Sequence, residues 1–132
     1  MKQAIVNGIV HTGDEILNKA VVIIENGIII SVQNEIPEAV NLIDLKGKHL
    51  SAGFIDIQIN GGQKLYFSQY PTEETIQDIY ETSLKFGTTH TLPCLISSSN
   101  ETILQGIEAI RSYRTKHNNG VMGMHLEGPF LN

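Results

Sequence analysis

The chain has 132 residues, of which 41% are hydrophobic, and it carries a formal net charge of −5. This composition supports a small hydrophobic core and excludes a chain that is disordered by composition. The acidic balance provides no basic field for a phosphate backbone, so we expect no nucleic-acid partner. No apolar run approaches the roughly 18 residues of a membrane-spanning helix, so we expect no membrane partner.

Cysteine content and the first residues indicate the compartment. The single cysteine, Cys94, cannot form an internal disulfide, which is typical of a reducing environment. The first residues lack the apolar region and cleavage site of a signal peptide. We therefore expect a cytoplasmic protein.

Residues 1–50 have the pattern of short strands joined by tight turns. Asn-Gly pairs at 7–8 and 26–27 lie between apolar, mostly β-branched residues. Asn-Gly suits a two-residue hairpin turn, because both central positions take a positive φ. A Lys-Gly pair at 46–47 marks a further turn. We predict a small antiparallel β unit with a hairpin at each Asn-Gly pair.

From residue 51 onward, strands alternate with helices. The apolar run 53–60 predicts a strand, and its polar residues Asp56, Gln58 and Asn60 fall two apart, on one strand face. Hydrogen bonds among these side chains could fix the position of the strand. Alternatively, the side chains could bind a water or a substrate hydroxyl.

Two helices follow, each with start signals. The pattern over 71–87 predicts a helix capped by Thr72, with this buried stripe: Ile76, Ile79, Tyr80, Ser83 and Leu84. The pattern over 98–117 predicts a second helix with a capping box of Ser98 and Glu101. Its expected buried stripe is Ile103, Leu104, Ile107 and Ile110.

Residues 88–96 and 121–127 predict two more strands. Near-continuous apolar strands separated by helices favour parallel pairing through crossovers. Three parallel strands cannot close on themselves, so we expect either the centre of a small open sheet or the opening of an eight-stranded barrel.

In both folds, ligands bind at the carboxyl ends of the parallel strands. This rule selects Gln58 and Asn60 after the first strand, and residues 94–99 after the second. After the third strand it selects His125 and Glu127.

His125 and Glu127 are candidate metal ligands. Strand alternation puts them on one face, ahead of a Gly-Pro turn at 128–129. An imidazole nitrogen and a carboxylate oxygen both suit zinc or iron, but zinc needs three or four ligands. The alternative for Glu127 is a solvated loop residue or a helix cap.

Taken together, segments 21–32, 44–62, 87–99 and 123–132 resemble the N-acetylglucosamine-6-phosphate deacetylase family of the amidohydrolase superfamily. The resemblance implies an α/β fold, the start of a (β/α)8 barrel with about three strands and two helices. Part of a small β-sandwich domain would precede it. Residues 1–50 would belong to the sandwich and residues 51–132 to the first βαβαβ portion of the barrel.

The resemblance also implies a reaction, the metal-dependent hydrolysis of N-acetylglucosamine 6-phosphate to glucosamine 6-phosphate and acetate. Glu127 would bind one divalent metal ion, zinc or iron, together with two histidines from later strands. Most of the superfamily carries His-x-His where this chain has Gln58 and Asn60, and a single-metal branch of the family shares that replacement. Gln58, Asn60 and His125 would line the site.

The resemblance places the proton-transferring aspartate and the phosphate-binding groups beyond residue 132, so we expect no catalytic residue in this chain. We expect an N-terminal portion of an amidohydrolase that is inactive by itself and holds no stoichiometric metal. Exposed strand edges and apolar surface predict a homo-oligomer. The alternative is a non-catalytic, self-associating half-barrel domain, with neither bound metal nor turnover.

Overall fold

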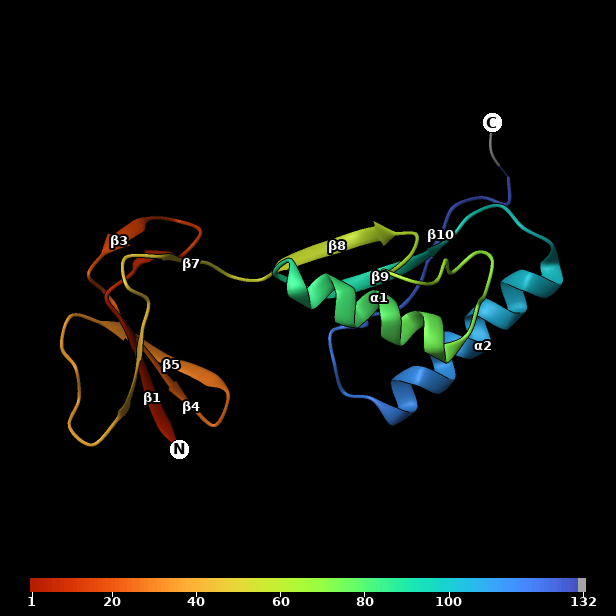
Figure 1. Ribbon diagram of the computed structural model, residues 1–132. Coiled ribbons are helices and arrows are strands. Elements are labelled where there is room, and N and C mark those ends of the chain that lie inside the picture. Colours follow the sequence, from red (N-terminus) through yellow and green to blue (C-terminus); the bar gives the residue numbers. More distant parts are fainter. Residues whose placement is uncertain (131–132) are drawn as a thin grey trace. The chain divides into compact units, whose positions relative to one another are not determined.

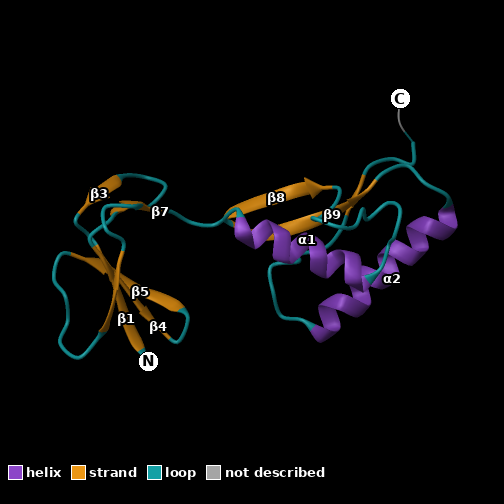
Figure 2. Ribbon diagram, in the orientation of Figure 1, coloured by secondary structure: helices purple, strands orange, loops and turns teal. Residues whose placement is uncertain are grey.

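The computed structural model describes residues 1–130, and the chain forms two compact units, Met1–Ala52 and a second that begins at Gly53 (Figure 1). The fold is mixed α/β, with mostly strands and two helices (Figure 2). Within residues 1–130, neither helix is long and apolar enough to cross a membrane.

The first unit contains two small sheets. A four-stranded sheet has the order β5-β4-β1-β6 and consists of β1 (Lys2–Val6), β4 (Val21–Glu25), β5 (Ile28–Gln33) and β6 (Asn41–Asp44). A three-stranded sheet has the order β3-β2-β7 and consists of β2 (Ile9–His11), β3 (Ile16–Asn18) and β7 (His49–Leu50).

The hairpin predicted at residues 7–8 is wrong. β1 and β2 lie in different sheets, and each pairs in parallel with a strand from residues 41–50: β1 with β6, and β2 with β7. Asn7 takes a φ of 57°, but Gly8 has no positive φ, so the pair bends the chain from one sheet into the next without reversing it. A Cβ on Gly8 would collide with Leu45, so glycine permits this close approach. The prediction of a purely antiparallel unit is wrong for the same reason.

The hairpin predicted at residues 26–27 is confirmed. β4 and β5 pair antiparallel across this turn, and Asn26 and Gly27 take φ values of 51° and 80°. The strands β4 and β1 form the centre of the larger sheet and bury side chains on both faces. Successive residues enter two separate clusters: Val21 and Ile23 pack in one, and Val22 packs in the other.

The second unit contains a parallel sheet of order β10-β9-β8, with strands β8 (Phe54–Ile59), β9 (Thr88–Leu95) and β10 (His125–Leu126). The predicted parallel pairing is confirmed. Helix α1 (Glu73–Lys85) connects β8 to β9, helix α2 (Asn100–Lys116) connects β9 to β10, and both lie on the same side of the β8–β9 pair (Figure 2). The third strand is shorter than predicted, although Val121 forms an isolated parallel bridge to Thr91.

One of the two predicted helix caps is confirmed. Thr72 caps α1, and its hydroxyl accepts a hydrogen bond from the Thr75 amide at 3.3 Å. The box predicted from Ser98 is wrong: Ser99 caps α2 by accepting from the Thr102 amide at 3.2 Å. The Ser98 hydroxyl instead donates to the Ile96 carbonyl at 2.9 Å, so it is already used by the turn before the helix.

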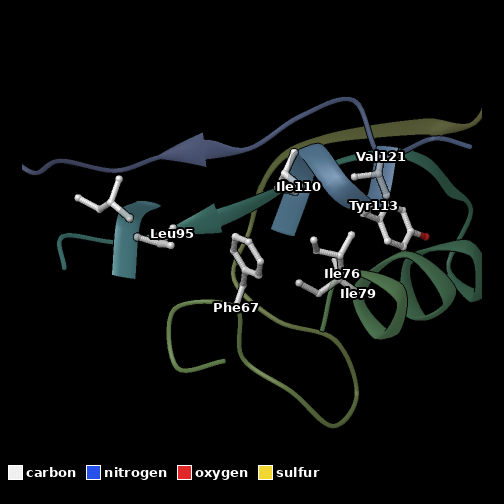
Figure 3. Packing of buried hydrophobic residues seen from close by; sticks show 8 residues of the cluster. Phe67, Ile76, Ile79, Leu95, Ile110, Tyr113 and Val121 are labelled. Atoms are coloured by element: carbon white, nitrogen blue, oxygen red, sulfur yellow. The ribbon is translucent and has the colours of Figure 1, made fainter. Parts of the chain in front are cut away.

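The helices pack on the sheet through a single cluster (Figure 3): Phe67, Ile76, Ile79, Leu95, Ile103, Ile110, Tyr113 and Val121. Half of the stripe predicted for α2 is wrong, because Leu104 and Ile107 are 66% and 38% exposed. The buried face instead includes Gly106 and Tyr113. A Cβ on Gly106 would lie 2.6 Å from Leu95 Cδ1, so α2 approaches β9 closely at this glycine.

Candidate functional site

The carboxyl ends of β8, β9 and β10 bring distant residues together on the helix-free face of the sheet. Ile59 and Leu95 pack against the helices, so their strand neighbours Gln58 and Cys94 point to the opposite face. Glu127 follows β10 directly, and its backbone amide donates to the Leu95 carbonyl at 3.0 Å. The predicted position of Gln58 and Glu127 at the strand ends is therefore observed.

Two side chains hold one oxygen of the Glu127 carboxylate. Gln58 Nε2 donates to Glu127 Oε2 at 2.8 Å, across 69 positions of sequence. The Cys94 thiol donates to the same Oε2 at 3.8 Å. Among residues 1–130, no hydrogen bond reaches Oε1. The carboxylate is thus oriented through one oxygen, and the other is available to a ligand.

Cys94 lies in the range 94–99 that the strand-end rule selected, but the sequence analysis assigned it no individual role. Its side chain is fully buried, and burial is the main reason why the pKa of its thiol is raised; the nearby Glu127 carboxylate raises this pKa further. The thiol therefore stays protonated at neutral pH and acts as a donor rather than as a nucleophile. Its position at the end of a parallel strand placed it in that range, and its alternation with the core residue Leu95 is the signal that points its side chain to the helix-free face.

His125 is held by the backbone of another strand. Its Nδ1 lies 2.9 Å from the Ile57 carbonyl oxygen. A carbonyl only accepts, so Nδ1 carries the proton, and in the neutral ring Nε2 keeps the lone pair. His125 pairs in register with Cys94, so both side chains lie on the helix-free face. The structure gives no hydrogen bond between His125 and Glu127.

Asp56 of β8 and Asn60, which directly follows β8, make no hydrogen bond to the Glu127 carboxylate within residues 1–130. Asp56 Oδ1 accepts from the Gln58 backbone amide at 3.0 Å, which is a local turn-like contact. Asn60 Oδ1 is buried without a hydrogen-bond partner among residues 1–130, while the Asn60 carbonyl accepts from the Phe67 amide at 2.9 Å. A buried, unpaired amide oxygen is costly, so Asn60 Oδ1 keeps an unused capacity to accept a hydrogen bond.

The loop after β9 supports the backbone of Glu127 from the other side. Ser97 Oγ donates to the Glu127 carbonyl at 3.3 Å. The next residue, Gly128, takes a φ of 97°, and a Cβ there would collide with Ser97. The peptide bond between Gly128 and Pro129 is cis. The glycine allows the β9 and β10 loops to meet, which fixes the position of Glu127.

Around Glu127, the described residues do not form a metal site by themselves. Within residues 1–130, no group of three or more His, Cys, Asp and Glu side chains could hold a metal ion. Glu127 has the right donor and an available oxygen, so it fits as one ligand of a larger set. Gln58 and Cys94 fit as the groups that orient this ligand.

Comparison with known proteins gives consistent relatives. The model of the NagA composite domain matches residues 3–50. The chain is 39% identical over 133 residues to the N-acetylglucosamine-6-phosphate deacetylase of Haemophilus influenzae, covering 99% of this chain and 35% of that protein. It is also 39% identical over 82 residues to an N-acetylgalactosamine-6-phosphate deacetylase of a Shewanella species, covering 62% of this chain and 21% of that protein.

Solved structures extend the same likeness. The crystal structure of N-acetylglucosamine-6-phosphate deacetylase from Pasteurella multocida matches with a TM-score of 0.95 and 34% identity, over 100% of this chain and 35% of that one. A D-hydantoinase shares the fold with a TM-score of 0.56 and 23% identity, over 96% of this chain and 27% of that one. The chain spans about a third of the length of the curated relative that it matches end to end. It therefore belongs to the N-acetylglucosamine-6-phosphate deacetylase family and matches the N-terminal part of its members.

Proposed function

We propose that the chain is the N-terminal portion of a metal-dependent amidohydrolase that hydrolyses N-acetylglucosamine 6-phosphate to glucosamine 6-phosphate and acetate. The observation that carries the proposal is the carboxylate of Glu127, oriented through Oε2 by Gln58 and Cys94 at the ends of three parallel strands. The deacetylases among the relatives act on phosphorylated N-acetylated amino sugars of both the gluco and galacto series, which supports this substrate class.

The architecture that goes with this proposal has two parts. Residues 1–50 would form part of a small β-sandwich domain, and residues 51–132 would form the first βαβαβ portion of an eight-stranded barrel. Parallel strands with both helices on one side support the barrel, because the other face is then free to line its interior. The fold shared with D-hydantoinase supports the same assignment.

Each residue of the site has a distinct role in the proposal. Glu127 would bind one divalent ion, zinc or iron, through Oε1, completed by ligands from outside this chain. Such an ion polarises a carbonyl oxygen as a Lewis acid. Gln58 and Cys94 keep the carboxylate in one orientation by donating to Oε2. The lone pair of His125 Nε2 and the unpaired Oδ1 of Asn60 would line the site and receive donors from the substrate or from water.

Under this assignment the chain by itself lacks a complete active site, so its catalytic activity and metal content test the proposal. We expect the 132-residue chain, supplied with zinc, to release no acetate from N-acetylglucosamine 6-phosphate and to retain no stoichiometric zinc at Glu127. Turnover that disappears in Glu127→Gln but persists in Glu101→Gln, an exposed glutamate in the first turn of α2, would contradict this expectation.

A second function is favoured by the edge of the parallel sheet. Three apolar residues of β8, Phe54, Ile55 and Ile57, are 65%, 61% and 63% exposed. Exposed apolar edge strands pair readily with other chains, so the alternative is a non-catalytic domain that associates with itself. In either case we propose a homo-oligomer. Light scattering at micromolar concentration should detect it, and substituting Ile55 and Ile57 together by lysine should shift the mass toward the monomer.

A further inference from the structure

Two histidines meet on the smaller sheet of the first unit. β2 and β7 pair in parallel with Ile9 opposite His49. His11 lies two residues beyond Ile9, hence on the same face as His49 and diagonal to it. The two rings are 5.0 Å apart between centroids, and His11 Nε2 lies 2.7 Å from His49 Nδ1.

These two nitrogens have the chemistry of a metal-binding pair. At 2.7 Å one ring donates and the other accepts, so the pair shares a single proton. Imidazole nitrogen is a preferred ligand of zinc, nickel and copper ions. Two nitrogens at about 2.0–2.1 Å from one tetrahedral ion lie about 3.3 Å apart.

The pair can open to that separation at little cost. The nitrogens need to move apart by only about half an ångström from their present distance. His49 is exposed and His11 is half-buried, so rotation about their side-chain bonds can supply the movement. The turn after His11 carries two acids, Asp14 and Glu15, and both are exposed. Lys48, directly before His49, offsets part of their negative charge, so the two imidazole nitrogens carry the argument for metal binding.

We propose that His11 and His49 form a two-imidazole site for a divalent transition-metal ion. The ion replaces the shared proton, and water completes its coordination, because no third His, Cys, Asp or Glu side chain joins the pair within residues 1–130. Affinity is therefore below that of a structural zinc site with four protein ligands. Because β2 and β7 pair at only two positions, the ion also ties residues 41–50 to the N-terminal strands.

The test is a zinc titration of the whole 132-residue chain carrying Glu127→Gln, so that the carboxylate proposed to bind metal in the second unit is removed. NMR signals of the five histidine rings report the site directly. We expect the His11 and His49 signals to shift together and to saturate at one zinc per chain. Calorimetry on the same sample gives the affinity.

Single substitutions then measure how much each imidazole ring contributes to zinc affinity. His11→Gln and His49→Gln should each lower zinc affinity about tenfold or more, because the second imidazole binds intramolecularly once the first is bound. His90→Gln is the control, since His90 is also exposed but lies in β9 of the second unit. It should leave the affinity unchanged.

The proposal would be overturned if His11 and His49 only hydrogen-bond to each other and bind no metal ion. In that case zinc leaves both ring signals in place, or either single variant binds zinc as tightly as the parent. The ring signals are measured with both histidines intact, so they decide the question even if a variant fails to fold.

Discussion

Two mainly apolar strands, β4 and β8, differ in how far their side chains are buried. Val21, Val22 and Ile23 of β4 are all buried, whereas Ile55 and Ile57 of β8 are more than half exposed. The strand β4 lies inside its sheet and packs on both faces, while β8 has one strand neighbour, β9. An apolar run thus predicts a strand, but burial depends on how many neighbours the fold provides.

The largest effect that this comparison predicts is a difference between two isoleucine truncations. Ile23→Ala should cost about 2–5 kcal/mol, because it opens a cavity in a packed cluster. In the monomeric chain, Ile57→Ala should change stability by no more than about 0.5 kcal/mol, because Ile57 is already 63% exposed. Hydrogen exchange of the β4 and β9 amides measures each unit separately. Equal losses in the two variants would contradict the burial difference.

The packed side of the second unit can be tested at a glycine. Gly120 lies against β9, where Thr91 donates to its carbonyl at 2.9 Å, and an added Cβ would collide with the Thr89 carbonyl oxygen. Gly120→Ala should therefore destabilise this unit by about 1–3 kcal/mol. Gly123→Ala is the matched control, since its Cβ would meet only the Leu92 side chain at 3.4 Å. If Gly120→Ala is tolerated, β9 and the segment around Gly120 are not closely packed.

The helix-free side of the same sheet can be probed through Cys94. Burial is the largest cause of its raised pKa, and the Glu127 carboxylate is the second. Glu127→Gln should therefore lower this pKa, increase the thiolate fraction at neutral pH, and speed alkylation by iodoacetamide a few-fold. Because the thiol remains buried, the rate should stay well below that of an unfolded chain. An unchanged rate would argue against the contact between Cys94 and Glu127.

The smallest expected effect concerns a polar contact between the two helices. The pKa of Glu73 is lowered, first by the hydrogen bond from Lys116 and then by that from Ser112. A lowered folded-state pKa stabilises the fold above the ordinary carboxyl range, and the benefit is lost as pH falls through the folded-state value. Glu73→Gln should thus flatten the acid side of the stability curve slightly. If the Glu73→Gln variant keeps the full pH dependence of stability, other groups are responsible for the acid sensitivity.

Much of the second unit could be predicted from sequence because its signals are local and agree with one another. Thr72 begins α1 as expected, and the apolar strands with intervening helices pair in parallel. The Ser98 prediction failed because serines occupy 97–99, and spacing alone does not decide which hydroxyl faces the first turn of α2. The predicted burial of Leu104 and Ile107 was wrong because the close approach at Gly106 turns another face of α2 to the sheet.

The first unit was harder to predict because its strands take partners from far along the chain. An Asn-Gly pair gives the same local signal at 7–8 and at 26–27. Only the second makes a hairpin, since residues 41–50 occupy the neighbouring positions of β1 and β2. In the site, Gln58 and Glu127 were found by the strand-end rule. The same rule selected the range 94–99, but the contact of Cys94 with Glu127 required the register that pairs Cys94 with His125.

The most direct test of the central claim, that Glu127 is a metal ligand of a deacetylase, uses a hybrid enzyme. This chain would replace the matching 35% of the Haemophilus influenzae deacetylase, and acetate release and bound metal would be measured on one sample. We predict turnover of N-acetylglucosamine 6-phosphate that Glu127→Gln lowers at least about 100-fold with loss of one metal ion per chain, because even groups that only orient a metal ligand contribute roughly 10- to 100-fold. Glu101→Gln should retain both. A folded hybrid whose metal content and turnover survive Glu127→Gln would contradict the claim.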